Sequence, residues 1–156
     1  MTSAATAPRR TSTVSVQRTI VVDTPIELVF GYLSDFTTTT EWDTGTVRTD
    51  KQSGNGGVGT TYRNISRFLG RTVELTYTVE EFVDKQLLRL RAIHNTLTAL
   101  DTMTFRTAAA GTEVSYTADF SFTGPVRLLT PMVKPAFERL ATRAESGMRA
   151  ALDRLD

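Results

Sequence analysis

Residues 87–105, LLRLRAIHNTLTALDTMTF, hold two strand-like runs separated by Asn95-Thr96. In both runs apolar residues alternate with polar or charged ones, which is the period of a half-buried β-strand. A two-residue turn at Asn95-Thr96 would join the runs as an antiparallel hairpin and would fix their register. We therefore predict a hairpin with one shared inner face, made of Leu88, Leu90, Ala92, His94, Leu97, Ala99, Asp101, Met103 and Phe105.

The same period appears on both sides of this hairpin. Residues 73–79 alternate with apolar side chains at the odd positions, and residues 112–122 alternate with Val114, Tyr116, Ala118, Phe120 and Phe122 on one face. A further β-branched run covers Val14 to Val22. Successive antiparallel strands of this kind build one continuous curved sheet, and we expect about seven strands in it.

Helical signals lie at the two ends of the sheet. Thr24, Pro25 and Glu27 have the spacing of a capping box with proline at the first helical position, so a helix is expected to begin there. A second short helix or turn is expected over residues 36–42. The main helix is expected to start near Pro135, and its apolar stripe to pack on the sheet. The stripe consists of Phe137, Leu140, Ala141, Ala144, Met148, Ala151, Leu152 and Leu155.

The predicted fold class is therefore α+β, in a single domain. A chain of 156 residues is within the usual range for one domain and is long enough to bury a substantial core. We place this domain at residues 14–156. Residues 1–13 are small, polar and proline-containing, and we expect them to form a flexible tail.

Composition excludes several classes of function. The sequence has no cysteine and only one histidine, which rules out thiolate chemistry, Cys-based zinc sites and two-histidine metal motifs. We predict no metal and no cofactor. The net charge of +1 gives no sign of a nucleic-acid partner, and no apolar run has the length of a membrane span. We expect a cytoplasmic protein that is a monomer or a homodimer.

A glycine-rich stretch, Gly54 to Gly59, matches the G-x-G-x-x-G pattern of dinucleotide-binding loops. That fingerprint requires a helix directly after it, because the helix N-terminus holds the pyrophosphate. Residues 60–65 read as a strand instead. The glycines are interpreted as a flexible hairpin loop.

Two polar residues interrupt the predicted inner face and are candidates for chemistry. Histidine is a common acid or base in proteins, so His94 is one candidate, and Asp101 on the neighbouring strand would be expensive to bury alone. One reading makes them a cavity acid/base pair or a polar anchor for a ligand. The alternatives place His94 at the solvent rim of its strand and turn Asp101 outward at a bulge. Tyr77 and Tyr116 complete the candidate catalytic set.

Aromatic residues lie on separate elements, and ordinary core packing is the simplest explanation for most of them. The alternative is a pocket wall with a few tyrosine hydroxyl groups pointing inward. The candidate ligand-binding residues are Trp42, Tyr62, Tyr77, Leu90, His94, Asp101, Met103, Tyr116, Phe120, Phe137 and Ala141.

The order of elements and several short motifs resemble the START-like SRPBCC superfamily, in particular its polyketide cyclase/dehydrase and lipid-transport branch. The matching segments are 23–30, 33–36, 41–43, 57–62, 68–71, 79–82, Phe105, 111–114 and Gly124. The resemblance spans roughly residues 14–155. It implies a helix-grip fold, in which a curved antiparallel sheet wraps around the C-terminal helix and leaves a deep apolar cavity between them.

Three functions are compatible with these observations. The first is a carrier or sensor that binds a small hydrophobic molecule, lipid or polyketide-like, in the cavity. The second is a polyketide aromatase/cyclase or dehydratase, whose chemistry needs an acid/base group beside the substrate. The third is an interaction module that uses its surface, with the cavity collapsed.

Overall fold

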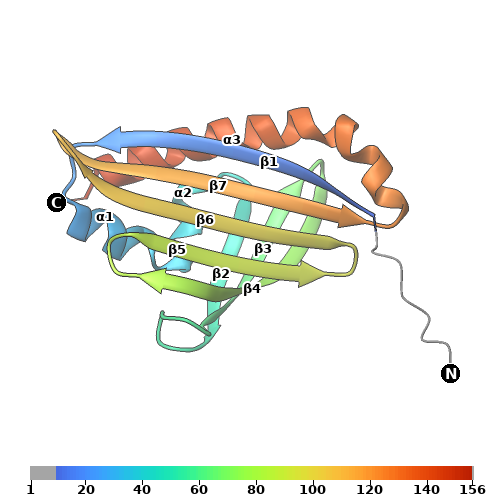
Figure 1. Cartoon of the computed structure of the whole chain (residues 1–156), viewed down its shortest axis with the longest axis horizontal. Helices are drawn as coiled ribbons and strands as arrows, with labels where there is room; N and C mark the ends of the chain where they lie inside the picture. The colour runs from blue at the N-terminus through green and yellow to red at the C-terminus, as the bar shows by residue number, and fades with distance from the viewer. Residues whose placement is uncertain (1–9, 156) are drawn as a thin grey trace, which may run out of the picture.

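A seven-stranded antiparallel sheet forms the body of the molecule (Figure 1). The computed structural model describes residues 10–155. Along the sheet the strands follow the order β1-β7-β6-β5-β4-β3-β2. Their bounds are β1 Thr11–Val22, β2 Thr46–Ser53, β3 Thr61–Phe68, β4 Arg71–Val83, β5 Leu87–His94, β6 Leu97–Ala108 and β7 Gly111–Thr123.

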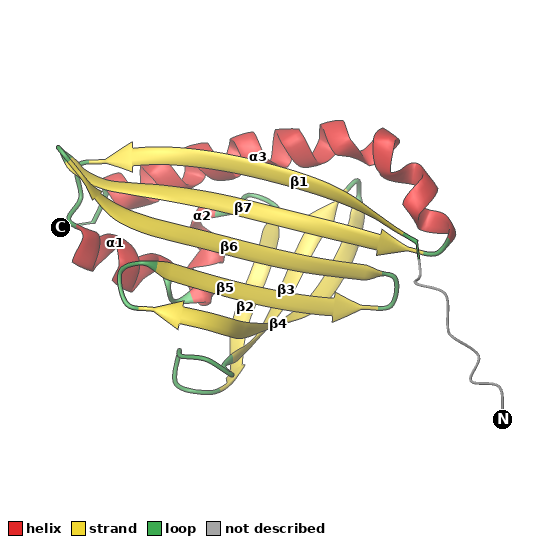
Figure 2. Ribbon diagram, in the orientation of Figure 1, coloured by secondary structure: helices red, strands yellow, loops and turns green. Residues whose placement is uncertain are grey.

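Helices cover one side of this curved sheet (Figure 2). Helix α1 (Ile26–Leu33), the 3₁₀ turn η1 (Phe36–Thr38) and helix α2 (Thr39–Trp42) lie between β1 and β2 in the chain. A second 3₁₀ turn, η2 (Pro125–Leu129), leads into the long helix α3 (Thr130–Asp153). The predicted α+β architecture, with short helices after the first strand and a long C-terminal helix on the sheet, is confirmed.

The hairpin predicted from residues 87–105 is present in the expected register. His94 pairs with Leu97 next to the turn, and Leu90 pairs with Asp101 in the middle of the two strands. Asn95 takes a positive φ of 48°, which a two-residue turn requires and which asparagine tolerates better than most residues. Odd-numbered residues of β4 as far as Val79 and even-numbered residues of β7 share the inner face, as their alternation indicates. A bulge between Val79 and Glu81 then reverses the parity of β4, so that Phe82 packs inward.

The start of the first helix differs from the prediction. Thr24 does not cap α1; its hydroxyl donates to the carbonyl of Leu152 at the end of α3, at 2.8 Å. The N-cap is Pro25, whose carbonyl accepts from the amides of Leu28 and Val29. Thr24 is buried, so a tertiary partner for its hydroxyl is worth more than a local cap beside solvent.

The start of the last helix was also predicted wrongly. Helix α3 begins at Thr130, five residues before the expected Pro135. Pro131 occupies the first turn, where a missing N–H costs nothing, and Pro135 then lies inside the helix. Its ring removes one hydrogen bond to the Pro131 carbonyl, and Phe137 packing in the following turn holds the segment on the sheet.

The folded domain begins slightly earlier than predicted. Residues 11–13, assigned to the tail, are part of β1, where Thr11 pairs with Thr123 and Thr13 with Ser121. The remainder of the predicted tail, apart from Arg10, lies outside the described residues. The glycine-rich stretch 54–59 is the loop between β2 and β3, as interpreted from the sequence.

One glycine explains how closely α3 approaches its neighbour. A Cβ atom built on Gly147 would lie 2.1 Å from the carbonyl oxygen of Trp42 in α2. Only glycine allows the two backbones to meet at this point. The contact places Trp42 in the interior, edge-on against Tyr116 with ring centroids 5.8 Å apart.

Candidate functional site

A cavity of about 360 Å³ lies between the inner face of the sheet and the N-terminal half of α3. Its walls are mainly apolar, and several come from small or aromatic side chains, including Ala118, Phe120, Phe137 and Ala141. Exposed residues Leu69 and Leu129 also line it, so the cavity reaches the surface between the β3–β4 turn and η2. The volume lies within the range of small-molecule sites.

Asp101 is the main polar group in this cavity. It lies on β6 with its side chain on the inner face, and only 5% of the residue is exposed. The Tyr116 hydroxyl donates to Oδ2 at 3.2 Å, whereas Oδ1 is buried without a hydrogen-bond partner among the described residues. Of the two sequence readings, the inward orientation is therefore the observed one. A buried oxygen of this kind can accept a hydrogen bond from a ligand or a water.

The surroundings of Asp101 raise the pKa of its carboxyl toward neutral pH. Burial raises its pKa to about 7, and the negative charge of Asp43 adds to the increase, while the Tyr116 hydrogen bond opposes it. Burial also raises the pKa of Tyr77 and of Tyr116 far above the usual value, with the charge of Asp101 as a further cause. At neutral pH both tyrosines are therefore hydrogen-bond donors, and Asp101 exists in both protonation states.

Asp43 is the second carboxyl that lines the cavity. It follows Trp42 at the end of α2 and accepts hydrogen bonds from the Gly45 amide and the Thr46 hydroxyl, each at 3.0 Å. Burial raises its pKa as well. Two carboxyls in one apolar cavity disfavour simultaneous ionisation, which favours a site that holds a proton.

A polar side-chain network continues from Asp43 along β2 and β3. Asn64 donates from Nδ2 to Thr46 Oγ1 at 3.3 Å and to Thr49 Oγ1 at 2.8 Å, and its Oδ1 accepts from Ser66. Asn64 and Ser66 line the cavity. Sequence reasoning missed Asp43, Asn64 and Ser66 as site residues. Residues of β3 alternate between the two faces, so Asn64 points inward like the buried Tyr62. This alternation is the sequence signal that could have identified Asn64 as a site residue.

Six of the eleven proposed ligand-binding residues line the cavity. They are Tyr77, Asp101, Tyr116, Phe120, Phe137 and Ala141.

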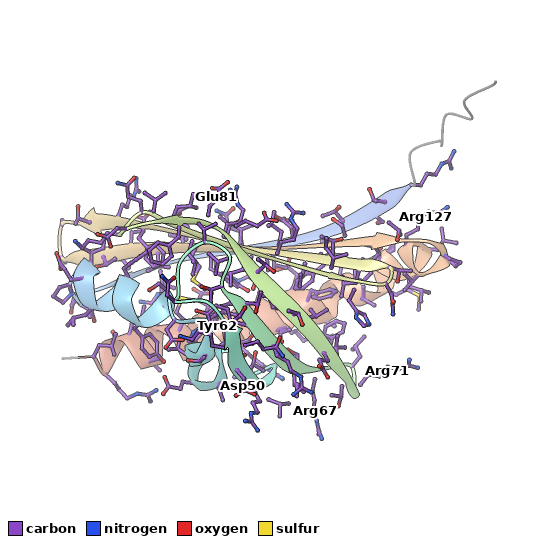
Figure 3. All side chains as sticks on the ribbon, turned by 90° about the horizontal axis from the view of Figure 1, so that it is seen from below. Asp50, Tyr62, Arg67, Arg71, Glu81 and Arg127 are labelled. Atoms are coloured by element: carbon purple, nitrogen blue, oxygen red, sulfur yellow. The ribbon has the colours of Figure 1, made fainter. Side chains whose placement is uncertain are left out.

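The other five proposed residues lie elsewhere. Trp42, Leu90 and Met103 are fully buried in the core beside the cavity. Tyr62, labelled in Figure 3, lines a separate, more polar hollow near the β2–β3 loop. His94 is exposed at the end of β5, next to Asn95, as the solvent-rim alternative has it. Asp101 therefore has Tyr116, and not His94, as its partner.

The described residues hold no group of three His, Cys, Asp or Glu side chains arranged to bind a metal ion. Within the same residues, no helix has the length and apolar character needed to cross a membrane.

Fold and cavity together define a helix-grip protein with an interior cavity, and the family comparison agrees with this fold. Residues 13–156 match the family model described as "Polyketide cyclase / dehydrase and lipid transport". The chain belongs to this family. No curated protein sequence matches it.

Solved structures share the fold at low sequence identity. The aromatase/cyclase Zhui from Streptomyces sp. R1128 is 15% identical, with a TM-score of 0.77 over 91% of this chain and 94% of that one. TTHA0849 from Thermus thermophilus is 18% identical, with a TM-score of 0.73 over 90% and 96% of the two chains. The di-domain aromatase/cyclase BexL is 12% identical, with a TM-score of 0.68 over 88% of this chain and 49% of that one.

Proposed function

We propose that the protein binds a small hydrophobic molecule in the cavity and carries or senses it. The observation that carries this proposal is the combination of apolar walls with a buried, unpartnered Asp101 Oδ1. Apolar walls supply affinity through burial, and a few fixed polar groups supply orientation. The ligand expected from this lining is mostly apolar and has a hydroxyl or another donor that reaches Asp101.

Mass spectrometry of an extract from purified, denatured protein, beside a mock purification, is the first test. A discrete apolar compound found only with the protein is the expected result. Fatty acids, sterols and aromatic polyketides are then added to the intact protein while thermal unfolding is followed. A true ligand stabilises by ~2.7 kcal/mol at one hundred times its Kd. No shift with any member of the panel would contradict the proposal.

A matched pair of variants on α3 tests whether the ligand occupies this cavity. Ala141→Leu adds a side chain into the cavity and should abolish or weaken the ligand-induced shift. Ala150→Leu makes the same change on the exposed face of the same helix and should leave the shift intact. An equal effect of both variants would place binding elsewhere.

A polyketide cyclase or dehydratase activity is the second candidate, and one observation favours it. A carboxyl with a pKa of about 7 inside an apolar cavity has the protonation equilibrium that a general acid/base requires at neutral pH. In such a reaction Asp101 would remove a proton next to a carbonyl or deliver one to a departing hydroxyl. Tyr77 would donate a hydrogen bond to a carbonyl oxygen, while the Tyr116 hydroxyl donates to Asp101 and orients it.

Incubation of the protein with its extracted ligand separates the two candidates. Conversion that Asp101→Asn abolishes and Asp119→Asn preserves would support catalysis, because Asp119 has the same charge on the opposite face of the sheet. Recovery of unchanged ligand would support a carrier or sensor.

A further inference from the structure

Two segments flank the opening of the cavity. One is the β3–β4 turn, and the other is η2 with the first turn of α3. Phe68 of β3 stacks on Phe137 of α3 with ring centroids 4.3 Å apart. This contact joins the end of β3 to α3 at the cavity wall, and the side chains of the two flanking segments lie around the opening.

Apolar side chains gather on this surface, which we name the mouth surface. It holds five of the eleven large hydrophobic residues that are exposed in the described part of the chain. The other six are spread over other strands, loops and α1. Concentrated exposed apolar side chains indicate a contact surface. The members are Leu69 (64% exposed), Val126 (37%), Leu128 (70%), Leu129 (50%) and Met132 (76%).

The charges beside these side chains are of one sign. Segments 64–73 and 120–137 contain Arg67, Arg71, Arg127 and Lys134 but no Asp or Glu, although the whole chain carries only +1. Figure 3 shows Arg71 and Arg127 at the same end of the molecule. Arg67 and Arg71 also line the cavity opening.

Arginines elsewhere on the sheet are neutralised. Arg63, Arg89, Arg91 and Arg106 each form an ion pair with a glutamate. None of the ion pairs among residues 10–155 involves Arg67, Arg71, Arg127 or Lys134. The positive charge beside the mouth surface is therefore available to an external partner.

We propose that the mouth surface docks on an anionic lipid bilayer. Its aliphatic side chains insert among the acyl chains, and its cations contact the anionic headgroups. This inference rests on the proposed function, because docking is useful only if the cavity holds an apolar ligand. Such a ligand could then pass between bilayer and cavity without crossing water. A bilayer fits better than a protein, because flexible aliphatic side chains and single-sign charge offer little directional recognition.

Vesicle flotation measures docking directly. The protein should float with vesicles of phosphatidylcholine and phosphatidylserine, bind phosphatidylcholine alone more weakly, and dissociate as salt rises. Absence of flotation, or equal binding to both vesicle types, would overturn the proposal and would leave the surface for a protein partner.

Two pairs of variants separate the mouth surface from the rest of the molecule. Arg67→Gln with Arg71→Gln should weaken binding to anionic vesicles ~25-fold, at about fivefold per cation. Arg89→Gln with Arg106→Gln removes the same charge from the outer face of the sheet and should leave binding nearly unchanged.

The second pair tests the apolar side chains. Leu128→Ser with Met132→Ser should weaken vesicle binding at least about tenfold. Val58→Ser, at a residue 66% exposed in the β2–β3 loop, should not weaken it.

Each variant is checked by its thermal unfolding curve, so that loss of binding is not loss of fold. Equal effects of mouth and control variants would contradict the proposal. Failure of docking and failure of the proposed function are distinguishable, because flotation needs no ligand and ligand-induced stabilisation needs no vesicle.

Discussion

The two ends of the interior differ in packing although the same strands run through both. At the end covered by α1, Leu88, Met103 and Leu152 have no exposed surface. At the other end, Leu97 and Phe120 on β6 and β7 line open space of about 360 Å³.

The cause of this difference lies in what faces the sheet. Over the packed end, Phe30 of α1 meets Phe82 and Phe105 edge-on, with ring centroids 5.3 and 5.0 Å apart. Over the cavity end the main cover is α3, and it offers Ala141 and Ala144 between larger residues. The alternating pattern of a strand therefore decides which side chains point inward. The size of the residues on the covering helix decides whether those side chains are packed or line a cavity.

The largest expected contrast comes from leucine truncation at the two ends. Leu88→Ala should lower the free energy of unfolding by about 2–5 kcal/mol, because it opens a new cavity in a filled core. Leu97→Ala only enlarges existing space and should cost less than about 2 kcal/mol. Urea unfolding of both variants measures the difference, and equal losses would mean that the two ends are equally packed.

The titration of Asp101 should make stability depend on pH. Between the pKa of an unfolded aspartate, about 3.9, and the folded value of about 7, the folded protein holds a proton that the unfolded chain has released. The free energy of unfolding therefore falls as the pH rises through this window, by about 4 kcal/mol at most.

Asp101→Asn should remove this dependence. The variant should match the wild type near pH 4 and be more stable than it at pH 8, as chemical denaturation at each pH measures. Asp119→Asn, on the outer face of β7, is the control and should keep most of the slope, because the charge of Asp119 is the smallest of the causes that raise the pKa of Asp101. A stability difference that is the same at every pH would contradict the assignment.

A smaller contrast comes from two helical glycines. Glycine to alanine normally stabilises a helix by about 0.5–1 kcal/mol, and Gly31→Ala in α1 should do so, since nothing lies within 4 Å of the added Cβ. Gly147→Ala should instead destabilise by about 1–3 kcal/mol, because its Cβ meets the Trp42 carbonyl. Thermal unfolding of both variants should give shifts of opposite sign; stabilisation by both would show that α2 and α3 separate freely.

Local patterns predicted the sheet well and the helix starts less well. Strand parity identified Asp101, Tyr77 and Tyr116 as inward-facing residues, and the structure places all three on the cavity. The capping box at Thr24 failed because a distant carbonyl, that of Leu152, competes for the same hydroxyl. His94 has the right parity but lies at the end of its strand, where no element covers it.

By itself, the sequence determined the α+β class, the hairpin register, the inner face of the sheet and the resemblance to a family, because these follow from periodicity and from turn residues that act locally. Only the tertiary structure decided that the cavity stays open, that Asp43 joins Asp101 in it, and that Leu69 and Leu129 both line it. Each of these depends on how α2, η2 and α3 lie over the curved sheet, and contacts between segments so far apart in the chain leave no periodic signal.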